Sequence, residues 1–112
     1  MIEVAILNYL NGTLPVSTYM MRPENPPEQY CLMELTGSSL NEHIYTSTLA
    51  IQTYAPTLYD AAQIAWSACD AMREAADLLA EIASVDLNSI YNFTDPETKQ
   101  PRYQAVFDVI HY

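Results

Sequence analysis

Residues 57–79 read TLYDAAQIAWSACDAMREAADLL. Polar side chains recur in this stretch every three or four residues, so they fall along one stripe of an α-helix. The opposite face carries small and apolar side chains, which let a helix lie close to a flat surface. Thr57 with Asp60 three residues later has the spacing of a capping box and marks the helix start. The stretch therefore predicts a long helix packed across a β-sheet.

The segments around this helix predict strands, apart from the first dozen residues. Residues 2–11 place apolar side chains at helical spacing, and Gly12 follows them as a helix stop. Five other segments are rich in β-branched, aromatic or apolar residues, and two of them alternate apolar with polar side chains. These segments are residues 16–20, 30–35, 43–54, 85–93 and 103–112. The predicted order is α-β-β-β-α-β-β, an α+β fold in which a mostly antiparallel sheet of about five strands is packed by the long helix and the short N-terminal helix.

Turns and loops are predicted between these strands. Residues 36–39 (TGSS) predict a turn between the second and third strands. Residues 95–98 (DPET) have the signature of a type I turn, with Asp first and Pro second. Residues 22–29 hold three of the seven prolines, which favour an extended loop outside the sheet.

Length and composition predict one domain, residues 1–112, that buries a core. Half of the residues are apolar and only 16% are charged, with a formal net charge of −10. This charge opposes binding to phosphate backbones, so specific nucleic-acid binding is not expected. The apolar runs are too short for a membrane span and the start is unlike a signal peptide, so a soluble intracellular product is expected. Cys31 and Cys69 are expected to be buried reduced thiols, with a disulfide as the alternative.

The sequence predicts no enzyme, cofactor site or metal site. His43 and His111 stand alone, without further ligands at defined spacing. Two glycines are too few for a Gly-rich phosphate-binding loop. Asp70, Glu74 and Asp77 share one helix face, and a solvated face is a better interpretation of them than paired catalytic carboxylates.

An oligomer interface is the functional surface that the sequence predicts. Both faces of the last strand are apolar, whereas a two-layer domain buries only one face of its sheet. Nine tyrosines are also more than a small core needs, and Tyr is enriched at protein interfaces. The predicted interface residues are Val106, Ile110 and Tyr112 on the outer face of the last strand, Pro23, Pro26 and Pro27 in the loop 23–28, and Asp95 and Pro96 in the loop 95–101. The alternative is that loops or the first helix cover this second face within the monomer.

Three stretches resemble one phage protein family. They are the Pro-rich loop entering a strand (Pro23 to Tyr30), the strand end IQTY (51–54) before the Ala-rich helix, and the terminal segment RYQAVFDVIHY (102–112). Together with the order of elements, they resemble the tail terminator, or tail-completion, family of long-tailed phages and prophages. The resemblance implies an α/β subunit that assembles into a ring, usually a hexamer, and that has no catalytic residues or cofactor.

The same resemblance implies the partners and the location. The ring sits on the finished tail tube, stops its polymerisation and joins it to head-completion or connector proteins of the capsid. The expected location is the virion tail or neck, after assembly in the bacterial cytoplasm. DNA passes through such a ring, and an acidic lumen would repel it at short range. Two other functions stay open: another head–tail joining component of the neck, and a small α+β ligand-binding or regulatory module that holds an apolar ligand between helix and sheet.

Overall fold

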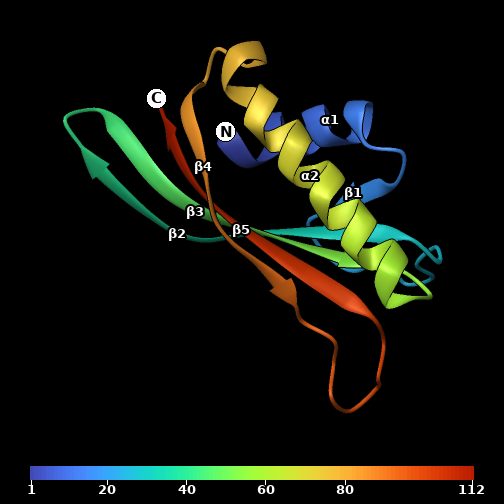
Figure 1. The fold of residues 1–112 in the computed structure, drawn as a ribbon. Helices are drawn as coiled ribbons and strands as arrows, with labels where there is room; N and C mark the ends of the chain where they lie inside the picture. Colours follow the sequence, from blue (N-terminus) through green and yellow to red (C-terminus); the bar gives the residue numbers. More distant parts are fainter.

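The computed structural model describes residues 1–112, and its element order is the predicted α-β-β-β-α-β-β. The elements are α1 (Ile2–Thr13), β1 (Ser17–Tyr19), β2 (Tyr30–Asn41), β3 (Ile44–Tyr54), α2 (Leu58–Leu78), β4 (Ile82–Asn92) and β5 (Arg102–His111). The predicted α+β fold with a five-stranded, mostly antiparallel sheet is confirmed (Figure 1).

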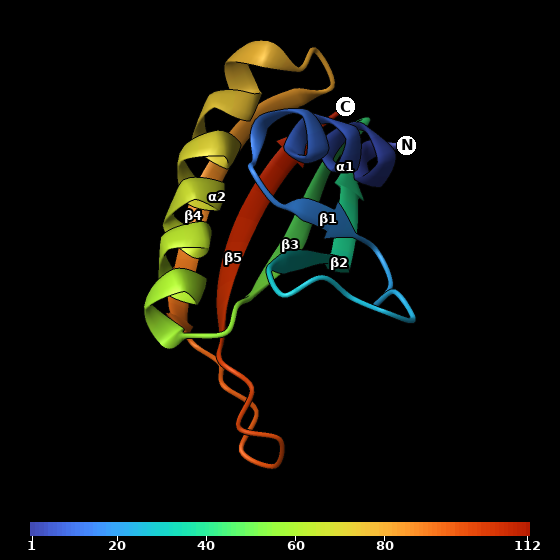
Figure 2. The same ribbon diagram turned by 90° about the vertical axis from the view of Figure 1, so that its right-hand side faces the viewer.

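The sheet has the strand order β1-β2-β3-β5-β4. Only the pairing of β1 with β2 is parallel, and β1 is the short edge strand that the sequence predicts. Both helices lie on the same side of the sheet, with α2 over β4 and β5 and α1 beside it near β1 (Figure 2). The molecule therefore has two layers, and α1 does not cover the second face of the sheet.

Helix α2 packs as its sequence predicts. The hydroxyl of Thr57 accepts a hydrogen bond from the backbone N–H of Asp60 at 3.1 Å, which caps the first turn. Small side chains such as Ala61, Ala65 and Ala68 are fully buried against the sheet. The predicted polar stripe faces solvent, apart from Asp60, which is half-buried. Helix α1 joins the same core and is tied to α2 because the hydroxyl of its Tyr9 donates to the carbonyl of Ala71 at 2.6 Å.

The core lies between the helices and one face of the sheet. From β5, Ala105, Phe107 and Val109 point into it, as the alternation of this strand predicts. Leu49 and Ile51 of β3 belong to the same cluster. The face assignment of the last strand is therefore confirmed, because Val106 and Ile110 are absent from this core.

The turn predicted at residues 36–39 is wrong. Strand β2 continues through these residues to Asn41, and its pairing with β3 shifts between Leu35 and Gly37. The Gly-Ser stretch is accommodated by this irregularity in the ladder, which glycine tolerates. The chain reverses instead at Glu42 and His43, whose φ angles are 52° and 69°. Two-residue hairpin turns need such positive φ values, which Asn and Gly usually supply.

The strict alternation predicted for residues 85–93 is also wrong. Strand β4 shifts register twice against β5, between Ile82 and Ser84 and between Leu87 and Ser89. Each shift inserts one extra residue and reverses which side chains face the core. As a result Ile90 packs against the core, whereas Tyr91, predicted on the same face as Val85, lies on the opposite face.

Candidate interaction surfaces

The sheet face opposite the two helices, here called the uncovered face, carries the predicted interface residues of β5. Val106 and Ile110 are half-buried there. Val106 pairs with Ala50 of β3, and Ile110 pairs with Thr46. The structure thus leaves these two apolar side chains without a helix above them.

Around these two residues the uncovered face is polar, which corrects the expectation of an apolar surface. Cross-strand partners share a face. By this rule the face includes Leu32 and Glu34 of β2, Thr46, Thr48, Ala50 and Gln52 of β3, Gln104, Val106, Asp108 and Ile110 of β5, and Ser84, Asp86, Ser89 and Tyr91 of β4. Asp86 lies directly opposite Asp108, and the side-chain amide of Asn88 donates to Asp108 at 3.1 Å. Such a mixed surface is typical of contacts between subunits that are already folded and soluble.

At one end of the uncovered face, aromatic rings and one guanidinium contact each other in a row, here called the aromatic row. Its members are Tyr19, Tyr30, Tyr54, Arg102 and Phe93. The rings of Tyr30 and Tyr54 stack at 4.6 Å, and Tyr19 meets Tyr30 edge-on at 6.3 Å. The guanidinium of Arg102 lies 5.9 Å from the Tyr54 ring and 4.5 Å from the Phe93 ring. The row therefore runs across the strands from β1 to the start of the loop after β4.

The polar groups of the row form a chain of hydrogen bonds. Arg102 donates to the hydroxyl of Tyr54 at 3.2 Å, and that hydroxyl donates to Gln52 at 3.0 Å. Gln52 in turn donates to Gln104 at 3.0 Å. The hydroxyl of Tyr30 is buried without a partner, and its burial raises the pKa of the phenol, an effect opposed by the charge of Arg22.

The two predicted loops lie at the ends of β2 and β5 that bear the aromatic row. In the first loop Pro23 and Pro26 are half-buried, whereas Pro27 is exposed. In the second, Pro96 is exposed and Asp95 accepts a hydrogen bond from the backbone N–H of Glu97 at 2.9 Å. That bond is the main reason why the pKa of Asp95 is lowered.

The turn after Asp95 is one residue longer than the predicted type I turn. The carbonyl of Asp95 accepts from the backbone N–H of Lys99 at 2.8 Å, so the closed turn spans five residues. Lys99 has a φ of 61°, the left-handed conformation. This loop, residues 93–101, projects away from the body of the sheet (Figure 1).

The predicted interface residues do not form one surface. Tyr112 follows β5 and is 67% exposed. It lies at the opposite end of β5 from the two loops, beyond Ile110. Eight residues of strand separate Arg102 from Ile110, which is roughly 27 Å. The set therefore divides into a loop end and a terminal end, with Val106 between them.

A projecting hairpin is the surface that sequence reasoning missed. The distal halves of β2 and β3 extend beyond the helices (Figure 1). Its exposed side chains include Leu40, Ile44 and Tyr45. The turn predicted at residues 36–39 would have made this hairpin shorter. Its full length is seen only in the structure, where the chain reverses at the positive-φ residues Glu42 and His43.

A buried Ser–His pair also escaped sequence reasoning. The hydroxyl of Ser47 lies 2.7 Å from Nε2 of His111 and 2.8 Å from the hydroxyl of Ser38. Nδ1 of His111 is buried without a partner, and Tyr45 stacks on the ring at 5.2 Å. A nucleophilic serine must reach its substrate, but Ser47 is only 1% exposed. No local sequence signal joins these three residues, because β2, β3 and β5 bring them together only in the fold.

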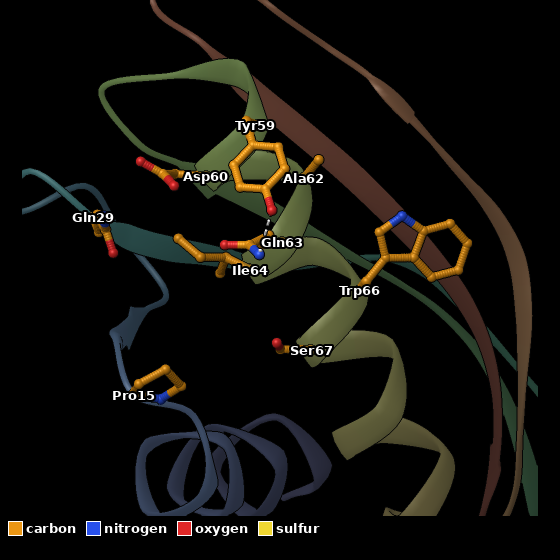
Figure 3. A pocket seen from close by; sticks show the side chains of 9 residues that line it. All are labelled: Pro15, Gln29, Tyr59, Asp60, Ala62, Gln63, Ile64, Trp66 and Ser67. Carbon is orange, nitrogen blue, oxygen red and sulfur yellow. Dashed lines mark hydrogen bonds between the residues drawn. The ribbon is translucent and has the colours of Figure 1, made fainter.

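Hollows in the surface flank α2 on both of its sides. The larger one, of about 580 Å³, lies between α2 and the segments that hold Pro15 and Gln29 (Figure 3). Trp66 touches its rim but points away from Pro15 and Gln29, and is 52% exposed. The cleft between α2 and the sheet, beside Cys69 and Phe107, holds only about 20 Å³.

The cysteines and the acidic residues do not gather into a ligand cluster. Cys31 and Cys69 are free and buried, and burial raises the pKa of Cys31 to about 12. No group of three or more His, Cys, Asp or Glu side chains is placed to hold a metal ion. No helix of the chain combines the length and the hydropathy that a membrane crossing requires.

Compared with known proteins, the chain matches no protein-family model and no curated protein sequence.

Proposed function

We propose that this protein is a structural subunit of a phage virion, a tail terminator that forms a ring, caps the tail tube and joins it to the head-completion proteins. The observation that carries the proposal is the uncovered face of the sheet. Two apolar side chains of β5, Val106 and Ile110, sit there in a polar surround without a covering helix. A second copy placed on this face removes their apolar surface from water.

The two projections support assembly into a ring. A ring needs two different surfaces on each subunit, which meet head to tail around the axis. The β2–β3 hairpin and the loop 93–101 leave the body of the sheet in different directions (Figure 1). Each offers a neighbouring subunit a contact that a flat two-layer domain lacks.

The charge supports the passage of DNA through the ring. The chain carries a net charge of −10, so the surfaces that no neighbouring subunit covers expose more carboxylates than basic groups. A lumen that exposes such carboxylates repels the phosphate backbone over roughly one Debye length, about 8 Å at physiological salt. This repulsion lets DNA pass without adhering.

Of the competing functions, a module that holds an apolar ligand between helix and sheet is the less well supported. Ligand pockets have volumes of about 300–1,000 Å³, whereas the cleft under α2 holds about 20 Å³. Another head–tail joining component of the neck would use the same surfaces. It differs from a terminator in which partner it binds, so binding to purified tail tubes separates the two.

The solution mass tests the proposal. A hexamer of the 12.6-kDa chain has six times that mass, about 76 kDa, and is measured by native mass spectrometry over a range of concentrations. Ile110→Asp is expected to leave the monomer folded and to abolish the larger species. The control variant Leu58→Asp places the same charge on the helix side, where Leu58 is 40% exposed, and is expected to keep the hexamer. A wild-type chain that stays monomeric at every concentration, and also with tail tubes added, would refute the proposal.

A further inference from the structure

A continuous furrow runs along the side of α2 that faces α1 and the segment after it. The hollow of about 580 Å³ described above adjoins a second one of about 270 Å³, and both are lined by Pro15 and Ser67. From Asp60 to Glu74 the furrow follows fourteen residues of helix, which is roughly 21 Å. An extended peptide of about six residues has this length.

The furrow has an apolar floor and a polar rim. Ile64 is 7% exposed and points toward Gln29 from the helix side (Figure 3). Leu14 and Pro15 supply the opposite wall. On the rim, the side-chain amide of Gln63 donates to the hydroxyl of Tyr59 at 3.1 Å, as Figure 3 shows.

The charges that line the furrow are all negative. Asp60, Asp70 and Glu74 contribute carboxylates, and no Lys, Arg or His belongs to the lining of either hollow. The nearest cation in sequence, Arg73, lies 3.7 Å from Asp70 in an exposed ion pair. Such an exposed pair contributes little to stability.

We propose that this furrow is a docking groove for an extended, Lys- or Arg-bearing segment of a partner protein. The apolar floor takes the aliphatic stems of the basic side chains, and the carboxylates take their charged ends. A second copy of this chain supplies no such segment. Its Lys99 follows Asp95 and Glu97 by four and two residues, and Glu24 follows Arg22 by two, so its basic residues lie close in sequence to acidic ones. The groove is distinct from the uncovered face, so the inference does not rest on ring formation.

The test uses a fluorescent octapeptide of alternating Lys and Ala, titrated with the full chain at low salt. Binding is followed by fluorescence anisotropy and mapped by backbone amide chemical shifts. The double variant Asp70→Asn, Glu74→Gln is expected to raise Kd roughly fivefold, from two exposed charge contacts of about 0.5 kcal/mol each. The matched control is Asp86→Asn, Glu97→Gln, which removes the same charge far from the furrow and is expected to change Kd much less.

Amide shifts confined to residues 59–75 and to the facing segment near Pro15 would support the groove. The same peptide with Ser in place of Lys is expected not to bind. Equal weakening by the two double variants would overturn the proposal, because it would mean attraction to the net charge alone. Shifts centred on the uncovered face, or no binding of the Lys peptide, would overturn it as well.

Discussion

Replacing Arg102 by Met is expected to destabilise the protein by about 2–3 kcal/mol. Arg102 is half-buried at the start of β5, where it donates to the carbonyl of Phe93 and to the hydroxyl of Tyr54. Its guanidinium also lies over both of their rings. Methionine keeps much of the aliphatic stem but removes the charge and all of the donors.

The magnitude follows from these contacts. Hydrogen bonds to a charged group contribute about 1.5–3 kcal/mol each, and a cation–π contact at a partly exposed site about 0.5–1 kcal/mol. The side-chain entropy of an ordered arginine, about 2 kcal/mol, offsets part of this sum. Solvent near the half-buried guanidinium weakens the rest, which leaves about 2–3 kcal/mol. For a domain of about 100 residues, this lowers Tm by roughly 10 °C.

The assay is urea unfolding followed by far-UV circular dichroism, with Arg73→Met as the matched control. Arg73 makes only an exposed ion pair at 3.7 Å, so its replacement is expected to cost less than about 0.5 kcal/mol. Amide exchange in residues 93–101 should also accelerate in the Arg102 variant, because Arg102 holds Phe93 at the base of that loop. If the two Met variants are equally stable, the contacts of Arg102 are not stabilising and the reasoning fails.

Three further predictions concern the cap, the core and a thiol. Thr57→Ala removes the hydrogen bond to the N–H of Asp60 and should cost about 1 kcal/mol in urea unfolding, whereas Thr57→Ser should cost almost nothing. Phe107→Ala, at a position 1% exposed, should cost about 3–5 kcal/mol, and a loss below about 1 kcal/mol would contradict its place in the core. Because burial raises the pKa of Cys31 to about 12, its thiol should resist Ellman's reagent at pH 8 until the chain unfolds. The folded chain holds this proton more tightly than the unfolded chain, so its contribution to stability is complete below pH 9 and is lost as the pH rises from about 9 to about 12.

Uninterrupted periodicity within single segments made the element order predictable from the sequence. The stripe of α2 and the cap at Thr57 are local signals with a direct physical cause, and both are present in the structure. The alternation of β5 predicted correctly that Phe107 is in the core and that Ile110 is not. These segments follow a single period without interruption, so one face is specified by hydrophobic burial alone.

The faces of β4 and the position of the β2–β3 turn were not predictable, because they depend on where the pairing register between strands shifts. The shift between Leu87 and Ser89 moves Ile90 to the core side, and no residue type in β4 marks that position. In the turn, Glu42 and His43 adopt the left-handed conformation, which these residue types rarely supply in hairpin turns. Gly37, by contrast, is typical of a turn but is part of strand β2. The pairing with residues on neighbouring strands decides both the register shift in β4 and the place of the turn.

The candidate surfaces were predicted only in part, for the same reason. The exposure of Val106 and Ile110 followed from alternation within one strand. The polar character of their surroundings depends on β3 and β4, whose facing residues include Thr46 and Asp86. The furrow beside α2 depends on the path of the chain after α1, which brings Pro15 to the helix, and no periodicity encodes that path.

The aromatic row has a mechanical consequence for the loop 93–101. Its rings and the guanidinium of Arg102 connect neighbouring strands, from Tyr19 of β1 to Phe93 after β4. A pull on the loop 93–101 would load Arg102 and Phe93 first, and then Tyr54, Tyr30 and Tyr19 of the edge strand β1. Force applied at this loop is therefore expected to be shared by β1, β2, β3 and β5 instead of separating β4 alone from the sheet.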